Sequence, residues 1–297
     1  MYFDTAGGPV FRPPSEANSF ILRVTQGCSH NACCFCAMYR GVNFRVRPLA
    51  EVLSQIEAAK PYAGHIRRIF LADGNALVLA TEKLLEILQV LRQTFPRLQR
   101  VSCYAGPKDM LKKTPEELVA LRDAGLKLVY YGLESGDDLV LSAINKGVSA
   151  AQAIEAGQRI VASGIKLSVM VIAGLGGQAY SGRHALYTAQ AVNAIQPQML
   201  SALTLMLYRG SPLAEQFEQG KFVALSPAAI MAELYQMLSA VDLPADRYCL
   251  FRSTHSSNYV GLAGTLPKDK DRLLRELQAA EVQLRGLRDW DPYNNVE

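Results

Sequence analysis

Short apolar runs rich in β-branched and aromatic residues alternate with longer segments of helical periodicity from position 20 onward. This alternation is typical of repeated strand–helix units around a parallel sheet. It predicts strands at residues 20–25, 68–72, 100–104, 127–133, 166–173 and 200–207, a further strand at 248–253, and helices near 48–59, 79–94, 115–124, 150–163, 180–195 and 226–240. Six such units make three quarters of an eight-unit barrel. We therefore predict an α/β fold, a partial (β/α)6-type TIM barrel that is open on one side.

The segments outside these units differ in composition. Residues 1–19 are rich in glycine and proline and are predicted to form an irregular lead-in to a core barrel at 20–215. Residues 216–297 are expected to form a C-terminal extension that is helical and covers the substrate, with a closing helix at 268–288. Thr114 and Ser226, each followed by proline, are predicted to cap the helices that begin there.

Composition narrows the class of protein. The chain has 297 residues, of which 49% are hydrophobic, enough for one compact catalytic unit. The net charge of +4 is spread along the chain and does not favour binding of intact nucleic acid. The first residues lack the pattern of a secretion signal, and no stretch approaches the roughly 18 apolar residues of a membrane span. We therefore expect a cytoplasmic protein without a membrane partner.

Four of the six cysteines lie close together directly after the first strand, where a parallel barrel places its active site. Three thiolates on an iron–sulfur cube leave one iron open to another ligand. Cys33 and Cys36 have the spacing of a short turn around one cube, and Cys28 supplies a third arm. Cys34 directly follows Cys33 and should point elsewhere, so we predict that it is not a ligand. A zinc site completed by His30, or a group of small buried thiols, are the alternatives.

At this loop the chain resembles the radical S-adenosylmethionine (SAM) superfamily. Phe35 precedes the last cysteine and Tyr39 follows it by three residues, as in that family. The common family spacing is Cys-x3-Cys-x2-Cys, whereas this chain has Cys28-x4-Cys33-x2-Cys36. The resemblance implies a 4Fe-4S cluster on these three cysteines, SAM on the open iron, and an electron donor such as flavodoxin or ferredoxin. It also implies a 5'-deoxyadenosyl radical that takes hydrogen from a substrate.

Other segments resemble the family at the ends of predicted strands. Asp73, Gly74 and Asn75 correspond in position to a glycine-rich motif that meets the methionine amino group, although an ordinary strand-to-helix turn has the same pattern. The stretch containing Glu134 and Ser135 resembles the Elp3-like and coproporphyrinogen-oxidase-like branches. There the resemblance implies that Glu134 accepts hydrogen bonds from the ribose hydroxyls; an acid at a helix start is the alternative.

The ends of the fifth and sixth predicted strands resemble the family segments around the adenine. Gly174 and Leu175 would flank the ring, since glycine lets the backbone approach a ligand closely. Met206 would cover it, or would be an ordinary core residue. Gly174 and Leu175 are therefore expected to be cofactor-binding residues, together with Phe35 and Tyr39 at the cysteine loop.

A polar stretch after the last predicted strand is the expected substrate wall. Arg252 can pair with a carboxylate or phosphate, and His255 and Asn258 can orient polar groups of the substrate. The alternative is a loop that caps the closing helix. Tyr104, at the end of the third strand, and Arg209, after the sixth, should also face the barrel mouth.

The remaining histidines and cysteines are expected to play no part in the chemistry. His65 and His184 lie in connecting or helical segments and are predicted to be surface residues. Cys103 and Cys249 stand alone and are predicted to be buried thiols.

Three functions stay open at this stage. The first is an enzyme that abstracts hydrogen from a small polar molecule, with a lyase, oxidoreductase or transferase outcome undetermined. The second is modification or breakdown of a tRNA-derived nucleoside or base, which the stretch around Glu134 suggests. The third is an iron–sulfur electron-transfer or sensing protein without catalysis, which the three-cysteine set disfavours because electron carriers usually complete four ligands.

Overall fold

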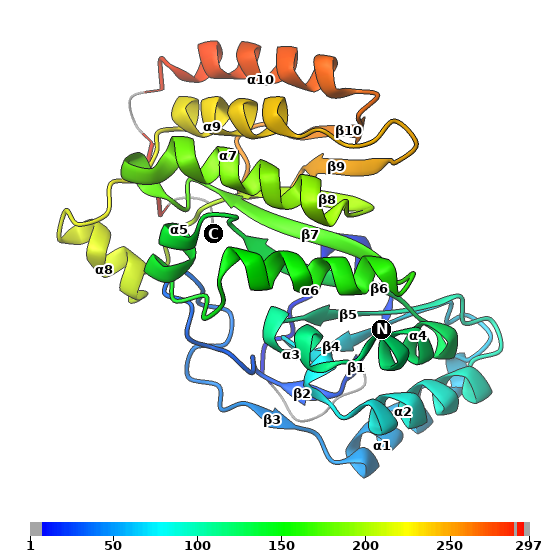
Figure 1. Ribbon diagram of the computed structural model, residues 1–297. Coiled ribbons are helices and arrows are strands. Elements are labelled where there is room, and N and C mark those ends of the chain that lie inside the picture. The colour runs from blue at the N-terminus through cyan, green and yellow to red at the C-terminus, as the bar shows by residue number, and fades with distance from the viewer. Residues whose placement is uncertain (1–7, 288–289, 294–297) are drawn as a thin grey trace. The chain divides into compact units, whose positions relative to one another are not determined.

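The structure is a computed structural model that describes residues 8–287 and 290–293. Eight strands form one sheet in the order β1-β4-β5-β6-β7-β8-β9-β10 (Figure 1). The strands β1, β4, β5 and β6 run parallel to one another, as do β7, β8 and β9, and β10 runs antiparallel to β9. Among the described residues, β1 and β10 are edge strands that do not pair with each other, so the barrel is not closed. The predicted α/β fold with an open, partial barrel is confirmed.

The chain divides into two compact units. The first contains the residues up to Asn31 together with Met38–Tyr131 and Arg159–Leu167, and the second contains Ala32–Ala37, Gly132–Gln158 and the residues from Ser168 onward. The cysteine loop therefore belongs partly to each unit, with Cys28 in the first and the other three loop cysteines in the second.

Strands β1, β4 and β5 of the first unit are almost continuously buried, as expected for a parallel sheet covered on both faces. Phe20 pairs with Ile69, and Ile69 pairs with Val101 in the next strand. The elements of this unit are β1 (Phe20–Arg23), β2 (Thr25–Gln26), β3 (Arg45–Val46), α1 (Leu49–Ala59), β4 (Arg68–Ala72), α2 (Thr81–Thr94), β5 (Arg100–Ala105), α3 (Pro107–Lys112), α4 (Pro115–Ala124) and most of β6 (Leu126–Glu134), with short 3-10 turns at Pro14–Glu16, Lys60–Tyr62 and Ala76–Val78.

The lead-in packs onto this unit through a buried carboxylate. Glu16 is 0% exposed and accepts hydrogen bonds from Arg100 Nη2 at 2.7 Å and from Tyr130 Oη at 2.7 Å. Ser15 Oγ lies 2.7 Å from the same tyrosine oxygen. A buried charge needs such partners, so the segment before β1 is fastened to the start of β5 and the middle of β6.

Strands and helices of the second unit form two adjoining layers. Helices α7, α9 and α10 lie side by side next to β8, β9 and β10 (Figure 1). The elements are α5 (Asp138–Ala143), α6 (Ala150–Ala162), β7 (Lys166–Ala173), α7 (Gly177–Ile195), β8 (Met199–Thr204), α8 (Pro212–Glu218), α9 (Pro227–Ala240), β9 (Cys249–Ser253), β10 (Leu262–Leu266) and α10 (Lys270–Leu284), of which α6 and β7 begin or end in the first unit.

Helix starts follow the predicted capping signals. Thr114 accepts from the backbone of Glu117, whose carboxylate accepts in return from the backbone of Thr114, and the two form a capping box. Ser226 accepts from the backbone of Ala229 at the start of α9. The closing helix is shorter than predicted and spans Lys270–Leu284; position 288 lies outside the described residues.

Three predictions about strands need correction. The first predicted strand, 20–25, is two elements, because β1 ends at Arg23 and β2 pairs with β3 instead. The sixth ends at Thr204, so Met206 lies beyond it. Strand β10 was missed in the polar stretch, although Leu262, Gly264 and Leu266 alternate as buried positions.

No helix among the described residues combines the length and the apolar character that crossing a bilayer would require.

Substituting alanine for Leu277 should destabilise the protein strongly, because this residue of α10 is 0% exposed. We expect the free energy of unfolding to fall by about 2–5 kcal/mol. Val282, in the same helix and 64% exposed, is the matched control, and Val282→Ala should change it by less than about 0.5 kcal/mol. Denaturant titration checks both variants. Equal effects at the two positions would contradict the placement of α10.

Candidate functional site

The first half of the cysteine loop rests on the turn that follows β4. Gly27 N donates to Asp73 Oδ2 at 3.1 Å, and Gly74 N donates to Gly27 O at 3.1 Å. A Cβ atom on Gly74 would lie 3.1 Å from both Cα and Cβ of Cys28. Contacts this short are tolerated only without a side chain, so Gly74 allows the backbone to approach Cys28.

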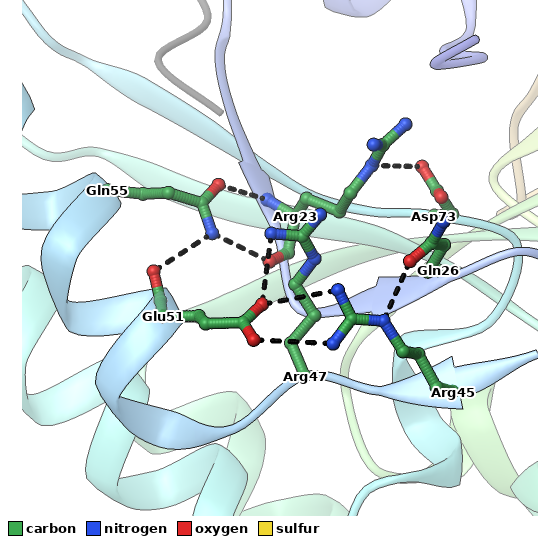
Figure 2. Close-up of polar contacts among 7 residues, drawn as sticks. All are labelled: Arg23, Gln26, Arg45, Arg47, Glu51, Gln55 and Asp73. Atoms are coloured by element: carbon green, nitrogen blue, oxygen red, sulfur yellow. Dashed lines mark hydrogen bonds and ion pairs between the residues drawn. The ribbon is translucent and has the colours of Figure 1, made fainter. Parts of the chain in front are cut away.

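A buried ion pair stabilises the contact between the turn after β4 and the start of the cysteine loop. Arg23 and Asp73 are each 1% exposed, and Arg23 Nε lies 3.2 Å from Asp73 Oδ1 (Figure 2). Burial raises the pKa of Asp73, while the Arg23 guanidinium opposes that rise. Asp73 N also donates to Thr25 Oγ1 at 2.9 Å. The Asp73 carboxylate is thus engaged by the chain itself and serves to hold the Cys28 arm.

Helix α1 fixes Arg23 in turn. Gln55 accepts from Arg23 N at 3.0 Å and donates to Arg23 O at 3.0 Å (Figure 2). One turn earlier, Glu51 pairs with Arg45 at 3.3 Å and with Arg47 at 3.3 Å. Arg45 belongs to β3 and also donates to Gln26 at 2.7 Å. These contacts connect β1 and β2, which precede the cysteine loop in the sequence, with β3 and α1, which follow it.

Asn75 lies at the centre of a second cluster of polar side chains in the first unit. Its Nδ2 donates to Ser29 Oγ at 2.8 Å and to Asp109 Oδ2 at 2.5 Å. Asn75 is 2% exposed, and within the described part of the chain its Oδ1 has no hydrogen-bond partner. Because a buried acceptor without a partner is costly, this oxygen is available to a donor supplied by a ligand.

Tyr39 presents the complementary case of a donor without an acceptor. The side chain is 4% exposed, and its ring packs edge-on against Phe11 at 5.3 Å. Its hydroxyl has no hydrogen-bond partner among the described residues. Burial, followed by the nearby charge of Asp73, raises the pKa of Tyr39, so the hydroxyl keeps its proton. Tyr104, at the end of β5, contributes to the same rise and is half-buried.

The second half of the cysteine loop is anchored in the other unit through Cys34. Cys34 N donates to Ile144 O at 3.0 Å, and Leu213 N donates to Cys34 O at 3.2 Å. Its thiol, 7% exposed, donates to Ala143 O at 3.6 Å, and Asn145 Nδ2 donates to Ala32 O at 3.1 Å.

Cys34 packs in an apolar cluster with the side chains of Leu141, Leu175 and Leu207, and Phe35 lies partly buried against the same cluster. Cys34 therefore points into the core, as predicted. Cys28, Cys33 and Cys36 are all half-buried and reachable from solvent.

Among the described residues, no group of three or more His, Cys, Asp or Glu side chains is placed to hold a metal ion. All six cysteines lie in the described residues, and none forms a disulfide. Thiolate donors suit an iron–sulfur cluster, and the ligand set of Cys28, Cys33 and Cys36 stays a prediction.

Glu134 ends β6 in a left-handed conformation with φ of 65°. Its carboxylate lies 3.0 Å from Lys146 Nζ, and both side chains are largely buried, at 13% and 11% exposed. A Cβ atom on Gly132 would collide with this carboxylate, at 2.0 Å from Oε1. The geometry pairs Glu134 with Lys146 through one carboxylate oxygen and leaves its remaining lone pairs for hydroxyl donors.

Ser135 and His184 form a buried pair. Ser135 Oγ lies 2.8 Å from His184 Nδ1 and accepts from Asp137 N at 3.0 Å. His184 Nε2 lies 3.0 Å from Ile172 O. The prediction that His184 is a surface residue is wrong, since it is 3% exposed. Most of the buried residues of α7 are small, so the sequence shows no strong apolar face that would indicate the burial of His184. His65 is exposed, as predicted.

The turn after β7 is held by a carboxylate from α9. Gly174 N donates to Glu233 Oε1 at 2.6 Å, and Ser181 Oγ donates to Glu233 Oε2 at 2.5 Å. Gly174 has φ of 83°, and a Cβ atom there would lie 2.5 Å from Ile230 Cδ1. Leu175 is 2% exposed. Sequence reasoning missed Glu233, whose only signal is an acid on an otherwise apolar helix face.

The polar side chains of the predicted substrate wall are hydrogen-bonded to other groups of the protein. Arg252 is exposed, and its Nη1 donates to Phe251 O at 2.7 Å and to Gly264 O at 3.3 Å. Asn258 Nδ2 donates to Ala202 O at 2.9 Å. His255 is half-buried with its Nδ1 2.9 Å from Ser257 Oγ, and burial lowers its pKa. Met206 is half-buried beyond β8. Roles in substrate binding at these positions stay predictions.

The sequence model of the Radical SAM superfamily matches residues 22–188, more than half of the chain. The chain belongs to this superfamily. Among curated proteins, none matches the chain in sequence.

Solved structures share the fold at low sequence identity. The radical SAM methyltransferase TsrM from Kitasatospora setae has a TM-score of 0.55 at 22% identity, over 67% of this chain and 39% of its own. Coproporphyrinogen III oxidase HemN from Escherichia coli, a radical SAM enzyme, has a TM-score of 0.56 at 18% identity, over 75% and 52%. Elp3 from the archaeon Methanocaldococcus infernus has a TM-score of 0.51 at 16% identity, over 80% and 59%. This chain spans less than two thirds of the length of each.

Alkylation should separate the cysteines into two groups. Burial raises the pKa of Cys103 and of Cys249 to about 12, so at pH 8 only about one molecule in ten thousand carries a thiolate there. We expect iodoacetamide to modify Cys28, Cys33 and Cys36 of the metal-free protein first. Peptide mass spectrometry measures the order. Labelling of Cys103 or Cys249 as fast as Cys28, without unfolding, would contradict the buried placement.

Proposed function

We propose that this chain binds a 4Fe-4S cluster through Cys28, Cys33 and Cys36 and uses SAM to abstract hydrogen from a small polar substrate. Membership of the radical SAM superfamily supports the cofactors. The observation that carries the ligand assignment is Cys34, whose thiol and backbone are engaged in the core of its unit while the other three loop thiols stay reachable. When bound, the cluster and SAM supply a one-electron reductive cleavage that yields a carbon radical.

The amino-acid end of SAM is proposed to bind beside Cys28. An ammonium donates and a carboxylate accepts hydrogen bonds, and the first unit offers one buried polar atom for each. Asn75 Oδ1 lacks a donor and the Tyr39 hydroxyl lacks an acceptor among the described residues. Asp109, which receives Asn75 Nδ2 at 2.5 Å, adds a negative charge that favours an ammonium. Asp73 and Gly74 are proposed to act through the backbone of the Cys28 arm.

The nucleoside end is proposed to bind in the second unit. The carboxylate of Glu134, fixed by Lys146 at 3.0 Å, is oriented to accept from the ribose hydroxyls. Ser135 fixes the backbone that follows Glu134 through hydrogen bonds with the His184 ring and with the backbone amide of Asp137. Backbone at Gly174 and Leu175 is proposed to flank the adenine, with Met206 and Phe35 providing apolar cover.

Substrate selection is proposed to lie with residues at the ends of β5 and β9 and directly after β9. Tyr104 is half-buried, and Arg252, His255 and Asn258 supply polar groups from the predicted 216–297 extension, which is proposed to cover the predicted 20–215 core. Because burial lowers the pKa of His255, this side chain is neutral near pH 7 and can donate or accept a single hydrogen bond. A small protein electron carrier such as flavodoxin or ferredoxin is the proposed reductant.

A panel of alanine variants tests the ligand assignment. After anaerobic reconstitution, Cys28→Ala, Cys33→Ala and Cys36→Ala should each lose most of the cluster iron and all 5'-deoxyadenosine formation from SAM. Cys34→Ala is the matched control and should keep both, at lower stability, because it removes a core side chain. Iron content, visible absorption and nucleoside yield are measured together. Loss of the cluster in Cys34→Ala alone would overturn the assignment.

Replacing Tyr39 by phenylalanine tests the SAM site. Since the Tyr39 hydroxyl has no partner to lose, stability should hold or rise, whereas the Kd for SAM should rise about tenfold or more through loss of a hydrogen bond to a charged group. Tyr130→Phe is the control, because that hydroxyl bonds Glu16; it should lower stability by about 1–2 kcal/mol and leave the Kd unchanged. Equilibrium dialysis and denaturant titration read the two effects. Unchanged SAM affinity in Tyr39→Phe would contradict the proposed site.

A further inference from the structure

Residues 290–293, here called the strap, lie across the end of β8. Leu207 N donates to Pro292 O at 3.1 Å, just beyond the last residue of that strand, Thr204. Tyr293 N donates to Asp291 Oδ1 at 2.8 Å, which closes a local turn. The strap is thus positioned by one backbone hydrogen bond to the segment that follows β8.

Tyr293 fastens the strap with its ring and its hydroxyl. The ring packs edge-on against Phe217 at 5.9 Å, and the Arg209 guanidinium lies over it at 4.7 Å. The hydroxyl donates to Glu218 Oε1 at 2.9 Å. Arg209 and Glu218 are both exposed. Contacts with exposed charged partners are weakened by water and salt, so the strap is fastened mainly by the packing of the Tyr293 ring against the apolar cluster around Cys34 and by one backbone hydrogen bond.

Trp290 and Pro292 close an apolar pocket beneath the strap. The cavity between them and Gly174, Leu205 and Ile230 has a volume of about 10 Å³. That is room for about one water molecule. Tyr259 and Thr204 bring the polar groups of an otherwise apolar lining. Apolar walls with a few polar groups suit a flat aromatic ring that carries hydrogen-bonding groups on its edge, yet the space is far too small to admit one while the strap lies in place.

We propose that the strap gates this pocket, opening to admit the adenine ring of SAM and carrying Trp290 away from the end of β7. The inference rests on the proposed function, which sets the adenine beside Gly174 and Leu175. Because a closed strap and a bound ring compete for the same space, the apparent affinity for SAM is reduced by the fraction of molecules in the closed form. Loosening the fastening at Tyr293 therefore strengthens binding.

Trp290 is the single tryptophan of the chain, so its fluorescence reports on the strap alone. In the reconstituted holoenzyme, SAM should shift Trp290 emission to longer wavelength, saturating at the concentration that equilibrium dialysis gives for binding. Without SAM, Tyr293→Ala should raise the acrylamide quenching constant of Trp290 about twofold or more, and should lower the Kd for SAM about threefold to tenfold. Tyr293→Phe, which keeps the ring and loses the bond to Glu218, should fall between the two.

Tyr248→Ala is the matched control, since this tyrosine of the same unit is 55% exposed and should alter neither quenching nor affinity. Two results would each overturn the proposed gate: an unchanged acrylamide quenching constant in Tyr293→Ala, or SAM binding without a shift in Trp290 emission. In either case the strap would be a fixed part of the pocket. Weaker SAM binding in Tyr293→Ala overturns the gate as well. Failure of the wild type to bind SAM overturns the proposed function instead, while raised quenching in Tyr293→Ala would still support a releasable strap.

Discussion

The buried ion pair between Arg23 and Asp73 fixes the point at which β1 becomes the cysteine loop. Removing one partner of such a pair leaves an uncompensated buried charge, at a cost of about 3–5 kcal/mol. Asp73 uses its second carboxylate oxygen to hold Gly27 N, the residue directly before Cys28. Gln55 of α1 holds the backbone of Arg23 on the other side. Helix α1 through the backbone of Arg23, and the turn after β4 through its guanidinium, therefore fix the same residue of β1, and Asp73 passes this placement on to the Cys28 arm.

The rest of the cysteine loop depends on a different kind of force. Cys34 sits among leucines and binds the backbone of the α5 end and of the α8 start. An apolar anchor of this sort fixes the chain without charge, while Cys33 and Cys36 on either side remain only partly buried. One loop is thus held by electrostatics at its first cysteine and by hydrophobic packing at its middle, each within a separate compact unit.

Much of the fold could be predicted from the sequence because buried parallel strands are continuous apolar runs and the helix starts at Thr114 and Ser226 carry their own caps. Local signals failed where long-range contacts decide the outcome. Strand β10 needs β9 beside it, and Gly264 in its middle weakens the strand pattern. His184 is buried because of Ser135 and Ile172, far away in sequence.

The candidate site shows the same limit. The cysteines are predicted as ligands from their residue type and spacing, and Glu134 is predicted as a ribose ligand from the family resemblance; both roles stay predictions. Asp73 was assigned to the site by position, whereas its buried contacts with Arg23 and Gly27 became visible only in three dimensions. Glu233 and the strap gave no local signal, since an acid on an apolar helix and a tryptophan in an aperiodic segment acquire meaning only from the groups that they touch.

The bond from Gly174 N to Glu233 also bears on how this chain can be divided. A barrel cut after residue 215 would lose α9, and the amide at the turn after β7 would then have no carboxylate to receive it. Ile230, which closes against Gly174, would leave with it. A segment of the predicted core and a helix of the predicted extension are therefore in direct contact, and removing the C-terminal part would disturb the turn to which the adenine is proposed to bind.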